Sequence, residues 1–209
     1  MFSGLERIEA RFECEVENTL ISKVYTFLQL ESFLQLESSI ILQKTDDYVD
    51  KDKEAILLAS YIDDNDLYFN DLKFSIYLDE GAEQKVFFDD EKSKVYKLND
   101  AIFYVNWTQY LESLMIHNIL FPETKYEIEG FLKINTTIYA VVSQSYILPS
   151  ERTDIEMVRR YMNAKGFVIK RKNDYVHSEL GLIIEDLHEE NVLVRDGTLF
   201  FIDTVMYLK

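Results

Sequence analysis

The sequence has few of the residues on which disulfide-rich, zinc-binding or membrane-spanning proteins depend. Its 209 residues include one cysteine, two prolines, six glycines and three histidines. The single cysteine, Cys14, cannot form an internal disulfide, and no histidine and cysteine residues have the spacing of a zinc site. No apolar run is long enough to cross a bilayer or to act as a secretory leader. We therefore expect a soluble, cytoplasmic protein.

Basic residues are also scarce relative to acidic ones. The chain has 22 Lys and Arg residues against 38 Asp and Glu residues, which gives a formal net charge of −16. Such a charge repels phosphate backbones and anionic lipid headgroups, so we expect neither nucleic acid nor a membrane as a partner, unless a local basic patch overrides the net charge. Apolar residues make up 47% of the chain, which has 14 Phe and 14 Tyr residues. The chain can therefore bury a core, and a disordered chain is excluded.

The first third of the chain, residues 1–71, is predicted to be a mainly helical segment. Apolar residues follow helical spacing from residue 5 to about 44. An acidic stretch at 45–54 is typical of a solvated linker, and a second helix is predicted at 55–62. We expect these helices to pack against the remainder of the chain and to cover apolar surface there.

From residue 72 onward the pattern changes to short β-rich runs that alternate with two helices. The strands are expected at 74–78, 85–88, 94–98, 126–134, 137–146 and, as short pieces around a polar loop, within 181–208. The helices are expected at 107–120, where Pro122 follows, and at 154–164, where Gly166 follows. Mixed strands and helices of this kind predict an α+β fold.

The polar loop near the C-terminus carries the residues with the clearest chemistry. Asp186 is followed five residues later by Asn191, and after a hairpin turn Asp203 ends a strand. Phosphoryl transfer needs one carboxylate to orient or deprotonate a hydroxyl, and an amide oxygen with a second carboxylate to hold Mg²⁺. Asp and Asn are also the residue types that cap tight turns, so the first two alone indicate little. The addition of Asp203 favours the chemical interpretation.

These motifs resemble those of the protein-kinase-like superfamily, namely the D-x-x-x-x-N catalytic loop and the metal-binding aspartate of the D-F-G position. They are most similar to the kinase-like domains of polyvalent proteins in bacterial mobile elements. The similar stretches are Asp79-Glu-Gly-Ala-Glu-Gln-Lys-Val-Phe, His117-Asn-Ile-Leu-Phe-Pro-Glu-Thr with Gly130-Phe131, and Asp186-Leu-His with Asn191-Val-Leu and Ile202-Asp203.

The resemblance implies a minimal kinase-like fold over residues 72–209. This module would have an antiparallel sheet lobe with one inserted helix, followed by a truncated C-terminal lobe. It would act as an ATP- and Mg²⁺-dependent phosphotransferase on an unknown substrate that bears a hydroxyl group. Asp186 would be the base, and Asn191 and Asp203 the metal ligands.

The resemblance also implies residues that bind the nucleotide. Gly81 and Val86 would belong to an abbreviated loop over the nucleotide, and Lys97 would contact its phosphates. A lysine on a strand is otherwise usually a solvated charge. Glu112, on the predicted helix 107–120, would pair with the ammonium group of Lys97.

The strand that ends near residue 146 would form the hinge against the adenine. Val142 and Gln144 are the residues implied there. His188, inside the catalytic loop, would have a structural role through a bond from its ring to the loop backbone, and His117 and His177 are predicted to be packing residues.

Three departures from the family pattern keep other functions open. Glu185 precedes Asp186 where protein kinases have arginine, and Thr204 follows Asp203 where they have phenylalanine. The next residues of the loop, Glu189 and Glu190, add negative charge that opposes charge build-up on a transferred phosphate unless they point away. The alternatives are a pseudokinase that binds nucleotide without turnover and an acidic interaction module that docks a basic partner.

Overall fold

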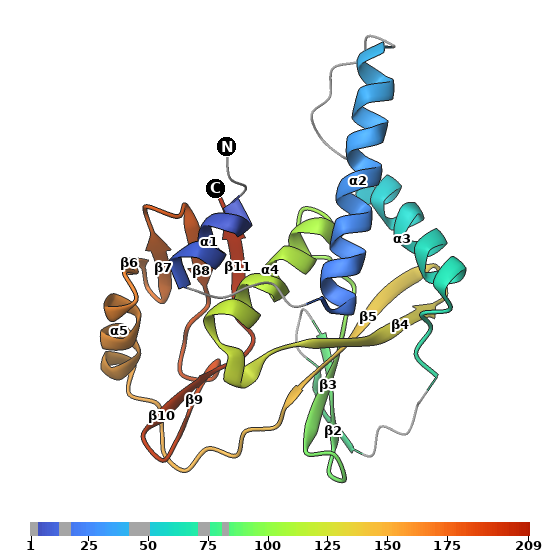
Figure 1. Cartoon of the computed structure of the whole chain (residues 1–209). Coiled ribbons are helices and arrows are strands. Elements are labelled where there is room, and N and C mark those ends of the chain that lie inside the picture. The colour runs from blue at the N-terminus through green and yellow to red at the C-terminus, as the bar shows by residue number, and fades with distance from the viewer. Residues whose placement is uncertain (1–3, 13–17, 42–50, 71–75, 81–83) are drawn as a thin grey trace. The chain divides into compact units, whose positions relative to one another are not determined.

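The computed structural model describes residues 4–12, 18–41, 51–70, 76–80 and 84–209 (Figure 1). The chain forms two compact units. Unit 1 consists of Met1–Val16, Glu112–Lys125 and Ser145–Lys209, and unit 2 consists of Glu17–Leu111 and Tyr126–Gln144. Helices and antiparallel strands occur in both units, which confirms the α+β class. The predicted boundary at residue 71 and the minimal-lobe architecture stay predictions.

Unit 2 is built on a five-stranded sheet of order β1-β2-β3-β5-β4. The strands are β1 (Ile76–Glu80), β2 (Gln84–Asp89), β3 (Lys94–Asn99), β4 (Glu127–Ile134) and β5 (Thr137–Ser145). Helix α4 (Trp107–Leu120) lies between β3 and β4 in the sequence, and its first turn belongs to unit 2. The predicted strands and the helix inserted among them are therefore present, although residues 74 and 75 of the first predicted strand lie outside the described residues.

Two helices of unit 2 precede the sheet. They are α2 (Leu20–Ile41) and α3 (Lys51–Asn65). Val24 and Leu28 of α2 and Leu58 and Ile62 of α3 are almost completely buried. This packing explains why the two helices form, because helical stability in proteins comes mainly from burial of an apolar face.

Helix α3 begins inside the stretch that the sequence analysis interpreted as a linker. That interpretation is wrong for residues 51–54, and residues 45–50 lie outside the described part. The helix begins early because its first turn makes tertiary bonds. The ammonium group of Lys51 donates to the carbonyl oxygen of Ala101 at 2.6 Å, and buried Glu54 accepts from the backbone N–H of Thr108 at 3.1 Å. Glu54 thereby caps the N-terminus of α4, whose first N–H groups have no partner within the helix.

The segment after α3 runs beside β4. The backbone N–H of Phe69 donates to the carbonyl of Phe131 at 2.8 Å, and the N–H of Phe131 donates to the carbonyl of Leu67 at 2.9 Å. Gly130 allows this approach, because a Cβ atom there would lie 2.9 Å from the carbonyl oxygen of Leu67. Its φ of +149° is also unfavourable for residues with side chains.

Unit 1 contains two small sheets and the helices that cover them. The four-stranded sheet has the order β11-β8-β7-β6, and β9 and β10 form a separate hairpin. The strands are β6 (Val168–Arg171), β7 (Asp174–His177), β8 (Leu182–Glu185), β9 (Val192–Arg195), β10 (Thr198–Phe201) and β11 (Val205–Leu208). Strands β6 and β7 were not expected from the sequence. All four side chains of β6 are exposed, so this strand has no apolar alternation, and β7 is only four residues long.

The helices of unit 1 are α1 (Gly4–Phe12), α5 (Ile155–Ala164), the 3₁₀ turn η1 (Pro122–Thr124) and the rest of α4. Ile8 of α1 and Ile116 of α4 are fully buried in the same core cluster as Met162 of α5. Asp154 caps α5 by accepting from the N–H of Glu156 at 2.9 Å. The stretch of helical spacing from residue 5 to about 44 contains two helices among its described residues, α1 and α2, which belong to different units. None of the helices in the described residues is long and apolar enough to span a membrane.

Candidate active site

Strand register brings the three residues of the polar loop together in unit 1. Strands β8 and β11 are antiparallel and pair Glu185 with Val205, so the residue after β8 lies at the end where β11 begins. Strands β9 and β10 pair Val192 with Phe201, so the residue before β9 lies beside the one after β10. Each of the three residues Asp186, Asn191 and Asp203 stands one or two residues beyond a paired position. The two registers therefore bring them close together.

The side chain of Asn191 links the two aspartate segments. Its amide nitrogen Nδ2 lies 3.1 Å from the carbonyl oxygen of Asp186, 3.2 Å from Oδ2 of the same residue and 3.3 Å from the carbonyl oxygen of Asp203. All three neighbours are oxygen acceptors, which fixes the orientation of the amide. The amide oxygen Oδ1 has no donor among the described residues and is the atom that can bind a cation.

Both aspartates have a left-handed backbone. The φ angle is +67° at Asp186 and +50° at Asp203. Asp tolerates this region better than most residues, and non-glycine residues held in it cluster at functional sites. Asp186 is further held by its backbone N–H, 3.5 Å from Oδ1 of Asp174, and by the N–H of Leu187, which donates to the carbonyl of Asn173 at 3.2 Å. The end of the β6–β7 turn and the start of β7 therefore support the loop that begins at Asp186.

His188 orients the carboxylate of Asp186. Its Nδ1 accepts from the backbone N–H of Glu190 at 3.2 Å, so the ring proton is on Nε2, which lies 3.3 Å from Oδ1 of Asp186. The expected bond between the His188 ring and the loop backbone is present. The side chain of Asp186 is 58% exposed, so the carboxylate can meet a substrate from solvent.

A buried polar network on α4 holds the segment that follows Asp203. His117 is fully buried, with Nδ1 2.8 Å from Oγ1 of Thr204 and Nε2 2.9 Å from the carbonyl oxygen of Thr124. Oγ of Ser113 accepts from the N–H of Met206 at 3.0 Å. This network could not be predicted from local spacing, because His117 and Thr204 are 87 residues apart.

Tyr207 in β11 holds the end of strand β8. Its hydroxyl donates to Oε1 of Glu185 at 2.6 Å, and this bond, with burial, raises the pKa of Tyr207 to about 12. Glu185, which replaces the arginine of protein kinases, therefore has a structural partner next to Asp186. The hydrogen bond from Tyr207 to Glu185 thus holds the residue that precedes Asp186.

The nucleotide-binding residues expected from the sequence lie in unit 2. Lys97 is 3% exposed, and its ammonium group donates to Oε1 of Gln144 at 3.0 Å and lies 5.3 Å from the ring centroid of Tyr126. Val86 is its direct partner across the β2–β3 pair. The structure thus brings together Lys97, Val86 and Gln144, which the sequence analysis assigned to the nucleotide.

Three further residues were expected in the site. Val142 is buried within β5 opposite Ile128, and Glu112 is half-buried on the part of α4 that belongs to unit 1. Gly81 lies outside the described residues. The adenine contact of Val142 and the pairing of Lys97 with Glu112 stay predictions.

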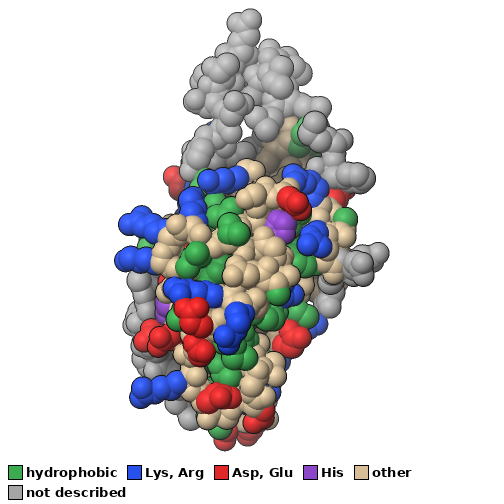
Figure 2. All heavy atoms as spheres, turned by 90° about the vertical axis from the view of Figure 1, so that its left-hand side faces the viewer, with side chains coloured by type: hydrophobic (Ala, Val, Ile, Leu, Met, Phe, Trp, Pro, Cys, Tyr) green, Lys and Arg blue, Asp and Glu red, His purple; other side chains and the backbone are tan. Residues whose placement is uncertain are grey.

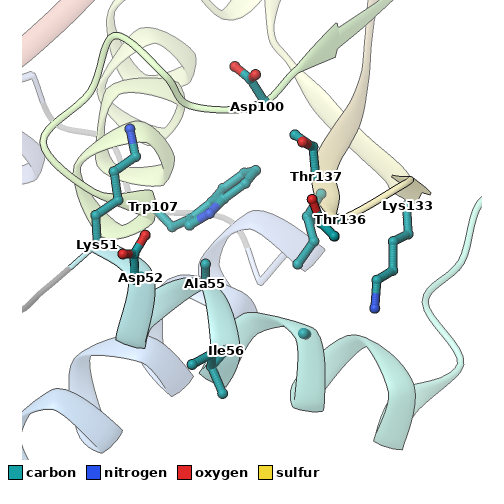
Figure 3. A pocket seen from close by; sticks show the side chains of 11 residues that line it. Lys51, Asp52, Ala55, Ile56, Asp100, Trp107, Lys133, Thr136 and Thr137 are labelled. Carbon is teal, nitrogen blue, oxygen red and sulfur yellow. The ribbon is translucent and has the colours of Figure 1, made fainter.

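A pocket of about 350 Å³ in unit 2 contains none of the predicted site residues. Figure 3 shows Trp107 between the first turn of α3, with Lys51 and Asp52, and the start of β5, with Thr137. This pocket lies where α3 and the start of α4 meet, next to the cap formed by Glu54. This pocket is therefore separate from the residues that the sequence assigned to the site.

Asn191 and Asp203 fit a Mg²⁺ ion that is also bound by phosphate. Among the described residues no group of three or more His, Cys, Asp and Glu side chains is placed to hold a metal. Mg²⁺ usually takes one or two protein oxygens and completes its shell with water and substrate phosphates. Oδ1 of Asn191 and the carboxylate of Asp203 match this pattern, in which the nucleotide brings the remaining ligands.

Comparison with known proteins identifies the family. No curated protein and no solved structure matches the chain. One family model matches residues 51–209, described as a serine/threonine/tyrosine kinase found in polyvalent proteins. The match starts at the first residue of α3, whose Lys51 and Glu54 hold the start of α4. The chain therefore belongs to the family of serine/threonine/tyrosine kinases found in polyvalent proteins.

Proposed function

We propose that this protein is an ATP- and Mg²⁺-dependent kinase that phosphorylates a hydroxyl group of serine, threonine or tyrosine in a protein. The substrate class comes from the description of the family to which the chain belongs. The observation that carries the proposal is the link from the amide of Asn191 to both Asp186 and Asp203. In this proposal Oδ1 of Asn191 and the carboxylate of Asp203 are the metal ligands, and the exposed carboxylate of Asp186 acts on the hydroxyl.

In the proposed reaction Asp186 accepts the proton of the substrate hydroxyl. The hydroxyl oxygen forms a bond to the γ-phosphorus, the bond from that phosphorus to the β–γ bridging oxygen breaks, and ADP leaves. His188 Nε2 contacts Oδ1 of Asp186 and the Asn191 amide contacts Oδ2, so the carboxylate is held in place from both sides. Each carboxylate oxygen has a second lone pair, and the exposed one of these can accept the proton. When bound through Asn191 and Asp203, Mg²⁺ neutralises charge on the phosphates.

Lys97 is assigned to the phosphates of the nucleotide. Its bond to Gln144 and the ring of Tyr126 hold the ammonium group in a fixed, buried position. A buried ammonium group is costly unless it is bonded, and a nucleotide phosphate would provide a stronger, charged acceptor than an amide oxygen.

Calorimetry with ATP and MgCl₂, followed by transfer of radiolabelled γ-phosphate to a mixed protein substrate such as casein, tests the proposal. Wild-type protein should bind ATP only in the presence of Mg²⁺. Asp203→Asn removes a proposed Mg²⁺ ligand and should therefore lose this Mg²⁺-dependent binding of ATP. The matched control is Asp196→Asn, which changes an exposed aspartate with a φ of +51° in the β9–β10 turn. A folded protein with no heat of ATP binding in the presence of Mg²⁺ contradicts the proposal. Binding without any transfer would identify a pseudokinase instead.

A further inference from the structure

The segment from residue 157 to 173 is basic in a chain that is otherwise strongly acidic. It contains three Lys and three Arg residues and no Asp or Glu, although the whole chain has a net charge of −16. Two of these cations have partners, since Arg159 pairs with Glu156 and Lys165 lies over the rings of Phe12 and Tyr161. The other four are Arg160, Lys170, Arg171 and Lys172.

These four cations are exposed, and none is bonded to a carboxylate in the part of the chain that the structure describes. Figure 2 views the side of the molecule that carries α5, β6 and β7, and Lys and Arg side chains are numerous on it. Three of them are consecutive, at the end of β6 and in the turn after it. We call residues 168–172 the β6 edge.

Strand β6 stands at the outer edge of its sheet, in the order β11-β8-β7-β6. An edge strand presents backbone N–H and C=O groups that no neighbouring strand pairs. All four side chains of β6 are exposed, including Val168 at 57% and Ile169 at 45%. Lysine on an edge strand opposes aggregation, but two exposed β-branched apolar residues do not serve that role.

The β6 edge leads directly to the candidate catalytic base. The turn that follows it contains Asn173, whose carbonyl accepts from the N–H of Leu187, and Asp174, whose carboxylate lies 3.5 Å from the N–H of Asp186. A chain segment that lies along β6 would therefore reach the residue that receives the hydroxyl proton. The β6 edge therefore combines positive charge with a direct connection to the segment that contains Asp186.

We propose that the β6 edge binds an extended, acidic segment of the protein substrate next to the hydroxyl that is phosphorylated. This inference rests on the proposed kinase function. The backbone of the segment would pair with β6, its apolar side chains would cover Val168 and Ile169, and its Asp or Glu side chains would pair with Lys170, Arg171 and Lys172. β-Strand addition of this kind gives affinity through the main chain and specificity through side chains.

The observations favour a peptide over nucleic acid. A free strand edge with exposed apolar side chains suits a polypeptide backbone, whereas nucleic acid is recognised mainly through its phosphates. The basic surface is also short, and the net charge of −16 would repel a longer polyanion that extends beyond it.

The test measures peptide binding without nucleotide. A fluorescent peptide of about ten residues, with one serine flanked by alternating Glu and Val, should bind wild-type protein, and binding should weaken with salt. The triple variant Lys170→Glu, Arg171→Glu and Lys172→Glu should lose about tenfold or more in affinity. The control variant Lys23→Glu, Lys53→Glu and Lys133→Glu makes the same charge change at exposed lysines of unit 2 and should bind as wild type does.

Several outcomes would overturn the inference. These are equal loss in the two triple variants, equal binding of a Lys-for-Glu peptide, and tighter binding of a single-stranded oligonucleotide of equal charge. Loss of ATP affinity in the β6-edge variant would assign the cations to the nucleotide and would also overturn it. A milder variant, Val168→Thr with Ile169→Thr, keeps the strand propensity and should weaken the acidic peptide a few-fold, because it removes only apolar contact.

The two proposals fail separately. Asp186→Asn should bind the acidic peptide as tightly as wild type, because the β6 edge is intact. Peptide binding without any phosphoryl transfer would refute the kinase function and keep the β6 edge as a docking site. Phosphorylation of casein with no preference for acidic peptides would refute the inference and keep the kinase function.

Discussion

The candidate residues of unit 1 and of unit 2 are held in different ways. In unit 1, Asp186 and Asp203 follow strand ends with a left-handed backbone, and Asp186 points to solvent. In unit 2, Lys97 lies within a paired strand, is 3% exposed and is bonded to buried Gln144. We therefore expect that replacing exposed Asp186 in unit 1 changes the stability of the fold little. Replacing buried Lys97 in unit 2 should change both stability and the proposed ATP binding.

The largest expected effect is on catalysis in unit 1. Asp186→Asn should lower the rate of phosphoryl transfer about 10³-fold, because the amide cannot accept the hydroxyl proton. Asn tolerates the left-handed backbone, so the urea unfolding midpoint should stay close to that of wild type. Single-turnover transfer and urea titration measure the two effects. A large fall in the unfolding midpoint would show that the exposed carboxylate is structural and would remove the contrast between the units.

The buried network beneath the loop should behave in the opposite way. His117→Ala removes a fully buried ring and leaves Thr204 and the carbonyl of Thr124 without their partner. We expect a loss of about 2–4 kcal/mol in the free energy of unfolding and slower phosphoryl transfer, because the segment after Asp203 loses its anchor. His117→Gln, which can keep one of the two bonds, should lose less. Equal losses for Ala and Gln would mean that packing alone matters there.

Lys97 in unit 2 should couple binding to stability. Lys97→Met should abolish ATP binding and cost about 1–3 kcal/mol, because Oε1 of Gln144 is left buried without this donor. In the double variant Lys97→Met with Gln144→Met both partners are apolar, so most of the stability should return while ATP binding stays lost. Urea titration and calorimetry measure the two properties. Recovery of ATP binding in the double variant would exclude Lys97 from the phosphates.

The smallest expected effect is a pH dependence in unit 1. His177 is 2% exposed, its ring nitrogens have no hydrogen-bond partner among the described residues, and burial, with Arg11, lowers its pKa below 6.5. Because the folded pKa lies below the unfolded one, His177 costs no stability above the unfolded value. As the pH falls from about 6.5 toward the folded pKa, protonation favours the unfolded state.

The unfolding free energy should therefore decrease over that pH interval in wild type and decrease less in His177→Leu. Denaturant titrations at several pH values between about 5 and 7.5 provide the comparison. An identical pH dependence in the two proteins would assign the acid sensitivity to other groups. The matched variant at the other buried histidine, His117→Leu, should lower stability across the whole interval.

Local spacing predicted the motif-bearing parts of the chain well. Asp186, Asn191 and Asp203 were found because their spacing follows the strand–loop–hairpin geometry, and the structure joins them through one amide. The family was identified correctly from these residues together with the stretches that begin at Asp79 and His117. The α+β class followed from the change of apolar period along the chain.

The features that were missed depend on partners distant in sequence. The bond of His117 to Thr204 and the cap that Glu54 provides for Thr108 join residues 87 and 54 positions apart. The pattern around His117 indicated the family but not this partner, and Glu54 stood in a stretch that was interpreted as a linker. Strand β6 escaped detection because its side chains are all exposed. Residue spacing predicts sites whose members are close in the sequence. Helix caps from distant residues and exposed edge strands do not produce a periodic pattern of apolar residues and therefore cannot be predicted in this way.

The left-handed backbone at Asp186 and Asp203 restricts which residues can replace these two aspartates. The φ angles of +67° and +50° favour glycine, asparagine or aspartate, and β-branched residues are the least compatible with them. A descendant that gives up phosphoryl transfer but keeps its fold is expected to carry asparagine or glycine at these two positions. Such replacements would be the mark by which inactive members of the lineage are recognised.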